Sequence, residues 1–219
     1  LLDATAVRNT EAVVSGNDAR LITSIGGSAL ANALTAARSV LENTTIVQTG
    51  NRAQDVRAGG GSAGVGRGTI AQVDLTGVAG ANVVAFASSQ LKGARLSVVG
   101  NQAAQLTATG GSALANSISF TDHRLAGSSG YQADVLANSA RNVQAFGGEG
   151  SILGGALADV RVSATALANS ISVSRGELTE APVHQVAGNT AKDVVATGGA
   201  AVANILWLFF AHVSGGTVV

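Results

Sequence analysis

Ten asparagines recur along this chain at a mean spacing of about 17 residues, a period in the range of repeat proteins. One set follows a glycine or alanine and comprises Asn17, Asn51, Asn101, Asn138 and Asn189. The other set follows an alanine and comprises Asn32, Asn82, Asn116, Asn169 and Asn204. A fixed period with small residues at the corners is typical of stacked β-structure.

The intervals between the two sets alternate in length. From each first-set asparagine to the next second-set asparagine, a short interval of about 15 residues alternates with a long one of about 31 residues, as if one repeat were inserted. Each long interval has room for one extra turn without asparagine, and we place these turns near Gly66 and Gly154. Asn17 and Asn204 are then separated by eleven steps of about 17 residues each.

The chain therefore predicts an all-β fold, a β-solenoid of about 12 rungs with about 17 residues each. Flattened coils of about 34 residues, each with two faces, are the alternative that this spacing leaves open.

Alternation of side chains favours strands within each repeat. The segment from Ala113 to Phe120 is expected to place Leu114, Asn116, Ile118 and Phe120 on one face, because successive strand residues point to opposite sides. Gly-Gly pairs between such segments supply the backbone freedom that tight corners need. We expect residues 1–219 to form a single elongated domain.

The asparagines themselves allow two interpretations. Equivalent positions in neighbouring rungs lie about 4.8 Å apart, so each inward side chain can donate its amide to the asparagine below and form a ladder. The ladder is the favoured interpretation, because a row of buried amides satisfies itself. Alternatively, the asparagines only occupy turns, where they tolerate left-handed backbone geometry.

Three segments depart from the repeat. Residues 121–131 and 174–183 carry charges and the single proline, and we expect them to be loops. Residues 200–213 are apolar and too short to cross a bilayer, so they are expected to cap the stack or to contact another subunit. The residues proposed for self-association there are Trp207, Leu208, Phe209 and Phe210.

Composition narrows the possible partners and compartments. Thirteen basic and thirteen acidic residues balance, which argues against nucleic acid or an anionic membrane as the partner. Cysteine is absent, so disulfides and thiolate metal sites are excluded. The chain starts at Leu1 and contains no methionine, which suggests a processed product or a fragment. No apolar run reaches the length of a membrane-spanning helix.

Catalytic and cofactor motifs are weak. The glycines around Gly61 match a dinucleotide fingerprint only formally, since no helix-like segment or acidic residue follows at the required distance. His123, His184 and His212 lack carboxylates at ligand spacing, and we expect solvated loop histidines. Asp55 and Asp193 share one repeat position, but its other members are not acidic. We therefore expect no catalytic residue, no cofactor and no metal.

The Gly-Asn-x-Ala and Ala-Leu-Ala-Asn-x-Ile-x-Phe units resemble those of bacterial cell-surface adhesive and matrix proteins with asparagine-rich β-repeats. The holdfast-anchor proteins of stalked alphaproteobacteria are the nearest resemblance, and curlin-like repeats are a more distant one. The resemblance covers residues 12–205 and implies an exported protein that attaches polysaccharide or matrix to the cell envelope.

Together these observations predict a non-enzymatic secreted or cell-surface protein, either an adhesin or the subunit of an extracellular fibre. It would be a homo-oligomer or filament that associates end to end, with a polysaccharide or cell-envelope component as a possible partner class. The alternative is a carbohydrate-binding or carbohydrate-active β-helix protein, which would need clustered carboxylates, arginines and aromatic residues on one face.

Overall fold

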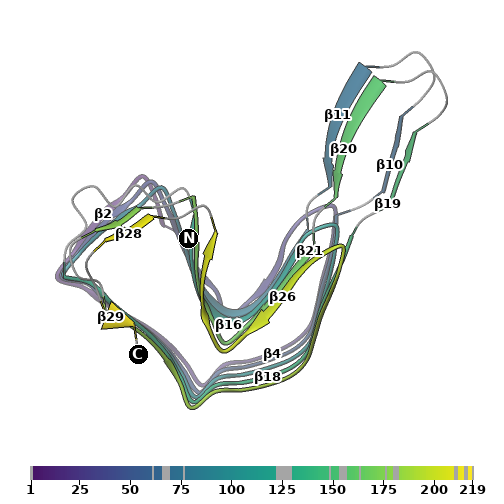
Figure 1. Ribbon diagram of the computed structural model, residues 1–219. Helices are drawn as coiled ribbons and strands as arrows, with labels where there is room; N and C mark the ends of the chain where they lie inside the picture. The colour runs from purple at the N-terminus through teal and green to yellow at the C-terminus, as the bar shows by residue number, and fades with distance from the viewer. Residues whose placement is uncertain are drawn as a thin grey trace.

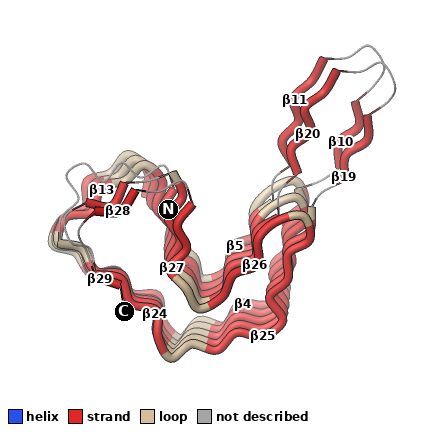
Figure 2. The backbone as a smooth tube through the Cα atoms, viewed as in Figure 1, coloured by secondary structure: helices blue, strands red, loops and turns tan. Residues whose placement is uncertain are grey.

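The computed structural model describes residues 2–60, 62–65, 70–75, 77–121, 130–147, 149–152, 157–162, 164–175, 177–179, 183–209, 212–214 and 217–218. Within these residues the fold is all-β, without helix, and the strands pair in parallel. Figure 1 shows successive turns of the chain stacked on one another, an arrangement consistent with a β-solenoid. Each turn is bent and has two lobes (Figure 2).

The narrow lobe is formed by a five-stranded sheet facing the first half of a bent sheet. The five strands are β4 (Asp18–Ile25), β9 (Arg52–Gly59), β15 (Gln102–Thr109), β18 (Ser139–Phe146) and β25 (Thr190–Thr197). The bent sheet contributes β5 (Ala29–Ala31), β12 (Val78–Ala87), β16 (Ser112–Thr121), β21 (Ala164–Ala168) and β26 (Gly199–Ala203). Alanines dominate the core between them, so the two sheets approach closely.

The wide lobe is closed by the remainder of the bent sheet and by two further sides. The bent sheet adds β1 (Leu2–Asp3), β6 (Leu34–Ala37), β22 (Ile171–Ser174) and β27 (Leu206–Phe209). One short side has β2 (Ala6–Arg8), β7 (Val40–Glu42), β13 (Gln90–Lys92), β23 (Glu177–Thr179) and β28 (His212–Ser214). The other side has β3 (Glu11–Ser15), β8 (Thr45–Thr49), β14 (Arg95–Val99), β17 (Gln132–Leu136), β24 (Val183–Ala187) and β29 (Thr217–Val218).

The wide lobe has a core of larger side chains. Its buried residues include Leu41, Leu96 and Ile118, and the rings of Phe86 and Phe120 stack with centroids 5.5 Å apart. The two cores are separate clusters. Because small side chains, mostly alanines, fill the narrow one, the few buried aromatic residues are needed only in the wide one.

The pairing register shows how the asparagine spacing relates to the fold. Asn17 and Asn51, which are 34 residues apart, lie side by side, and the strands that follow them pair in parallel. Pairing across about 17 residues, the first expectation, is not seen among the described strands, because the short asparagine interval is one passage through the narrow lobe. The 34-residue flattened coil is the alternative that agrees with this register.

Longer register intervals arise where segments leave the stack. Asn51 and Asn101 are neighbours although they are 50 residues apart, because the residues between β9 and β12 form an excursion of their own. There β10 (Ser62–Val65) pairs with β19 (Glu149–Ile152), and β11 (Ile70–Leu75) pairs with β20 (Leu157–Val162). These strands project from the tip of the narrow lobe (Figure 1). The extra turns expected near residues 66 and 154 are therefore not further rungs, although those two glycines lie outside the described residues.

Two further expectations need correction. Residues 174–183 are not wholly a loop, because β23 lies within them and pairs with β28. Leu114 does not share a face with Ile118 and Phe120: Asn116 has a left-handed backbone with φ of 47°, which shifts the alternation. Leu114 consequently faces outward, and Ala113 and Ala115 fill the core instead. Residues 122–129 of the other expected loop lie outside the described part.

Candidate functional site

The first asparagine set forms a hydrogen-bonded row along the stack. The side-chain amide of each member donates to Oδ1 of the next, with N–O distances of 3.0 Å or 3.1 Å. The backbone N–H of each member donates to the same oxygen at 2.9 Å to 3.1 Å. The row runs through Asn17, Asn51, Asn101, Asn138 and Asn189.

The second set forms a parallel row. Each side-chain amide donates to Oδ1 of the asparagine in the next turn, at 2.8 Å to 3.0 Å. The row runs through Asn32, Asn82, Asn116, Asn169 and Asn204. Asn82, Asn116 and Asn169 in its middle are fully buried, so these amides have no access to water as a substitute partner.

The second row also performs the turn role that was the alternative interpretation. All five of its asparagines have positive φ, between 47° and 54°, in the left-handed region that asparagine tolerates better than most residues. In the first row the residue before the asparagine takes this conformation. Those residues are Gly16, Gly50, Gly100, Ala137 and Gly188. Hydrogen bonding and turn geometry therefore coexist in the same residue in the second row and in adjacent residues in the first row.

The two rows line the neck between the lobes, and the second amide hydrogens of the second row bond across it. Asn116 Nδ2 donates to the carbonyl of Ser139 at 2.9 Å, directly after the first-row Asn138. The first row keeps its second amide hydrogen on its own side: Asn101 Nδ2 donates at 2.9 Å to the carbonyl of Gln48, which precedes Asn51 in the neighbouring turn. Gln48 itself donates to the carbonyls of Asn32 and Val83. A hydrogen-bonded wall thus separates two apolar cores, and each inner asparagine uses both amide hydrogens.

A further left-handed row follows the first asparagines by four residues. Its members are Leu21, Asp55, Gln105, Asn142 and Asp193, with φ between 52° and 57°. Two of these residues are aspartates, as the sequence shows. The property that all five share, however, is the left-handed backbone and not an acidic side chain. Leu21 adopts the same conformation although its side chain is 78% exposed.

The ends of the narrow lobe are open in the described structure. Strands β4 and β25 are the edges of their sheet. Near one end Ile25 is 90% exposed, and near the other Val195 is 43% exposed. Core residues Ile22 and Val194 are only partly buried there, whereas their counterpart Leu106 in the middle is fully buried. Apolar core surface therefore meets solvent at both ends.

The segment expected to mediate self-association lies at the C-terminal end. Leu206–Phe209 form β27, whose other side carries no partner strand among the described residues. Phe210 lies outside the described residues, and the side chains of Trp207, Leu208 and Phe209 are likewise not described.

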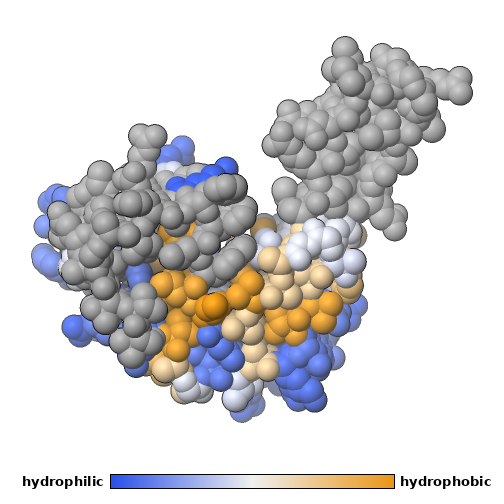
Figure 3. All heavy atoms as spheres, in the orientation of Figure 1, coloured by the Kyte–Doolittle hydropathy of each residue, from blue (hydrophilic) through white to orange (hydrophobic). Residues whose placement is uncertain are grey.

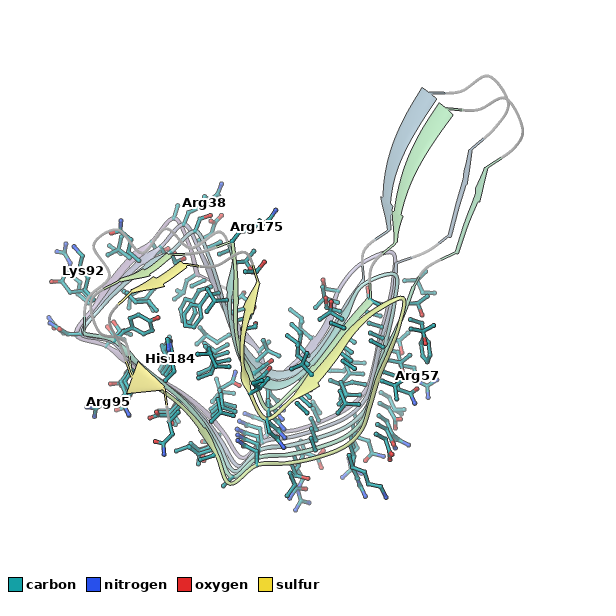
Figure 4. All side chains as sticks on the ribbon, in the orientation of Figure 1. Arg38, Arg57, Lys92, Arg95, Arg175 and His184 are labelled. Carbon is teal, nitrogen blue, oxygen red and sulfur yellow. The ribbon has the colours of Figure 1, made fainter. Side chains whose placement is uncertain are left out.

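One histidine contradicts the expectation of solvated loop histidines. His184 is buried in the wide lobe, where its Nε2 lies 3.1 Å from the Tyr131 hydroxyl (Figure 4 labels His184). Burial lowers the pKa of His184 to about 4 and raises the pKa of Tyr131. His184 is therefore a neutral core residue at physiological pH. On β17, the strand that pairs with the strand of His184, burial also raises the pKa of Asp134.

The hollows on the outer surface of the described residues include two of contrasting character. The concave side of the bent sheet forms an uncharged groove of about 580 Å³, lined by residues such as Leu114, Leu167 and Ser172. Figure 3, which looks onto the C-terminal end of the stack, shows hydrophobic side chains gathered between hydrophilic residues at the rim. The outer face of the five-stranded sheet carries a polar hollow of about 380 Å³, bordered by Arg52 and Arg141.

Across the described ranges, no three histidine, aspartate or glutamate side chains gather in a way that could hold a metal ion. None of the described segments forms a helix of the length and apolarity needed to cross a membrane. No family model, no curated protein and no solved structure matches the chain.

Proposed function

We propose that the chain is a non-enzymatic structural protein, an adhesin or extracellular fibre subunit that self-associates end to end. The observation that carries this proposal is the pair of asparagine rows, which run from one open end of the stack to the other. The parallel strand ladders run in the same direction. A β-solenoid with 34-residue coils and two amide rows is a stiff rod.

The mechanical role follows from how the bonds are arranged. Each inner turn is tied to its neighbours by strand hydrogen bonds on several sides and by amide bonds at the neck. Force along the rod is consequently shared among many parallel bonds, each worth about 1 kcal/mol net. A filament or a cell-surface stalk would use this property directly.

End-to-end association is supported by the open edges. Exposed strand edges readily pair with another chain, and natural proteins usually cover them. Strands β4 and β25 expose such edges beside partly uncovered core residues. Strand β27, which includes Trp207, lies at the same C-terminal end, as a contact or as a cap.

A secreted or cell-surface location belongs to the same proposal and rests on the resemblance to adhesive matrix proteins. The absence of cysteine and the balanced charge fit such a role without requiring it.

Negative-stain electron microscopy, combined with sizing across a dilution series, tests self-association. We expect rods whose length grows in steps of one molecule as the protein concentration rises. A particle of constant length, monomeric at every concentration, would contradict the fibre proposal and leave a monomeric adhesin.

The carbohydrate-binding alternative is favoured by one observation, the polar hollow on the five-stranded sheet. Asp18 is held by Arg20 through two hydrogen bonds of 2.6 Å and 3.0 Å, and that contact lowers the pKa of Asp18. Arg52 and Arg141 form no ion pair within the described part of the chain. Gln54, Gln102 and Ser139 between them offer hydrogen bonds to hydroxyl groups.

Such a hollow fits a polysaccharide that carries carboxylates, because arginine binds carboxylate in a bidentate manner. Affinity electrophoresis in gels containing polygalacturonate tests it, with a neutral dextran gel for comparison. Arg52→Ala with Arg141→Ala should abolish retardation, whereas Lys92→Ala, an exposed cation on another side, should preserve it. Equal mobility in both gels would remove this alternative.

A further inference from the structure

The concave face of the bent sheet carries hydroxyl side chains in two neighbouring turns. One turn contributes β16, and the next contributes β21 and β22, which pair with β16 in parallel. Three hydroxyl pairs line the groove and together form what we call the hydroxyl patch: Ser112 with Thr165, Ser119 with Ser172, and Thr121 with Ser174. The two residues of each pair lie about 4.8 Å apart, the spacing of neighbouring strands.

The adjacent turns hold apolar residues at the same positions. Strand β12 pairs with the other edge of β16, and its residues in these three rows are Val78, Ala85 and Ala87. On the opposite side of the patch, Ala200 of β26 stands in the row of Thr165. The fold therefore does not require hydroxyls in these rows, because apolar residues fit the same positions one turn away.

A fourth pair of hydroxyls lies where the sheet bends (Figure 2). Ser117 and Ser170 follow the left-handed Asn116 and Asn169, and they share one row in the same two turns. Both serines are fully buried, and neither hydroxyl oxygen has a hydrogen-bond partner among the described residues.

The row of these serines lies on the groove side of the sheet. It runs between the rows of Leu114 and Ser119, which both line the groove. In the preceding turn the row contains Val83, which is buried but belongs to neither apolar core. A methyl group placed at Gly80, in the row of Leu114, would lie 3.4 Å from Cγ2 of Val83. The row of Val83 and the two serines therefore points towards the bottom of the groove.

Two unpaired hydroxyls at this position lower the stability of the fold. A buried hydroxyl without a partner has lost its hydration and gained no hydrogen bond in exchange. Val83 shows that an apolar side chain fits the same row, so packing does not explain Ser117 and Ser170. Both serines stand in the two turns that carry the hydroxyl patch, which indicates a common ligand for all of these hydroxyls.

The lining of the groove indicates a ligand without charge. None of the described residues that line it is charged, and Leu114 and Leu167 form an apolar strip beside Ser112 and Thr165. A sugar ring has matching chemistry, since it combines an apolar face with hydroxyl groups at its edges. Serine and threonine hydroxyls both donate and accept, so they pair with sugar hydroxyls in either direction. A carboxylate in this groove would lose hydration without gaining a cation.

The direction of the rows indicates how such a ligand lies. A single row along the groove contains Val78, Ser112, Thr165 and Ala200, so the groove follows the stack across successive turns. An extended polysaccharide presents similar groups at every sugar and can contact successive turns in the same way. A flexible, coiled polysaccharide would lose more conformational entropy on binding.

We propose that the concave groove binds a neutral polysaccharide in an extended conformation. The sugar hydroxyls bond to the hydroxyl patch, the apolar face of a sugar packs on Leu114 and Leu167, and a chain lying against the bend supplies the missing partners of Ser117 and Ser170. The site is separate from the polar hollow on the five-stranded sheet, which is bordered by arginines. It does not depend on end-to-end association, because it lies on the side of the stack.

Affinity electrophoresis tests the groove with three neutral polysaccharides that have extended backbones: hydroxyethylcellulose, galactomannan and xyloglucan. We expect retardation in at least one of these gels, relative to a gel without polysaccharide. Raising the ionic strength should not weaken it, because no charges take part. Unchanged mobility in all three gels would overturn the proposal.

Ser119→Val combined with Ser172→Val removes two hydroxyls of the patch. Ala85 in the same row shows that the sheet accepts an apolar residue there. The variant should bind the retarding polysaccharide at least about tenfold more weakly, because hydrogen bonds to both residues are lost. Circular dichroism verifies that the variant is folded.

The matched control makes the same kind of change on another side of the stack. Thr49→Val and Ser97→Val lie in the sheet of β8 and β14, where their paired partners Val99 and Val47 are already valines. This control should bind like the unaltered chain. If the groove variant binds as tightly as the control, the polysaccharide lies elsewhere and the proposed site is wrong.

The buried pair allows a test with two readouts. Ser117→Val combined with Ser170→Val should raise the melting temperature, because two unpaired hydroxyls are removed. The same variant should bind the polysaccharide roughly threefold or more weakly, because the bend no longer offers hydroxyls. A higher melting temperature with unchanged affinity would exclude the buried pair from the site and overturn that part of the proposal.

The outcomes distinguish this inference from the proposed self-association. Retardation of a chain that stays monomeric at every concentration would support the groove and contradict the fibre. Filaments that none of the three polysaccharides retards would support the fibre and contradict the groove.

Discussion

The side-chain amide of Asn101 lies 3.1 Å from Oδ1 of Asn138, and both residues are buried at the neck between the two lobes. Asn101 also accepts two hydrogen bonds from Asn51 and donates one to the carbonyl of Gln48. A single side chain therefore satisfies polar groups in the turns on either side of it. Its loss would leave several buried groups without partners.

Replacing Asn101 should lower the stability of the fold substantially, whereas replacing Asn17, its counterpart at the open end of the row, should not. Asn101→Ala is expected to lower the free energy of unfolding by about 3 kcal/mol, because buried donors and acceptors remain unpaired. Asn17→Ala, at the exposed end of the same row, should cost less than about 1 kcal/mol. Urea denaturation measures both, and equal losses would show that the row is not a buried network.

The narrow lobe should not tolerate larger side chains. Ala103 fills its core, whereas the adjacent Ala104 lines the outer hollow. Ala103→Leu is expected to destabilise by about 2 kcal/mol or more through overpacking, and Ala104→Leu by no more than about 0.5 kcal/mol. Thermal unfolding of the two variants compares them directly. Similar melting temperatures would mean that the lobe is wider than the structure shows.

One left-handed position is occupied by a residue poorly suited to it. Leu21 has φ of 56° and an exposed side chain, whereas Asn142 occupies the same row in a later turn. Leu21→Asn should stabilise the protein by about 0.5–1 kcal/mol, because asparagine adopts this conformation at lower cost. The reverse change, Asn142→Leu, should destabilise by a similar amount. Denaturation midpoints that move in the opposite directions would refute the assigned backbone geometry.

Stability should fall in mild acid because of His184. Its pKa is about 4 in the fold and 6.5 when unfolded, so between these values the unfolded chain binds a proton that the native chain does not. Stability is then lost as pH falls from 6.5 towards 4, by up to roughly 3 kcal/mol. Asp134 acts in the opposite sense, since its raised pKa favours the native state once it is protonated.

Denaturation at several pH values measures this slope, and Asp134→Asn is the background that isolates the histidine. In that background, His184→Gln should flatten the dependence between pH 6.5 and 4 while keeping a polar group near Tyr131. A slope that survives in the double variant would assign the acid sensitivity to other groups.

The sequence predicted the strands and identified the asparagine positions, because small side chains and regular polar residues recur at fixed intervals. It did not identify which segments are neighbours, since Asn17 and Asn32 belong to one turn and to different rows. Two lobes of unequal width were also not foreseen. The local sequence does not distinguish an alanine in a narrow core from an alanine on the surface.

Other features could not be predicted from the local sequence pattern. The buried position of His184 depends on Tyr131 in the preceding turn, 53 residues away, so no motif at short spacing could reveal it. The reversal of Leu114 depends on the left-handed Asn116, and simple alternation ignores such a bend. The shared row of Leu2 and Leu208 emerges only when the register is followed through every turn, by way of Ala36, Phe86, Phe120 and Val173.

Hydrogen exchange of the asparagine side-chain amides, measured by nuclear magnetic resonance, tests the central claim most directly. The account predicts slow exchange for the inner members of both rows, among them Asn101 and Asn116, and rapid exchange for the exposed Asn9 and Asn43. Uniformly rapid exchange at all of these side chains would contradict the account, because no continuous buried amide row would then exist.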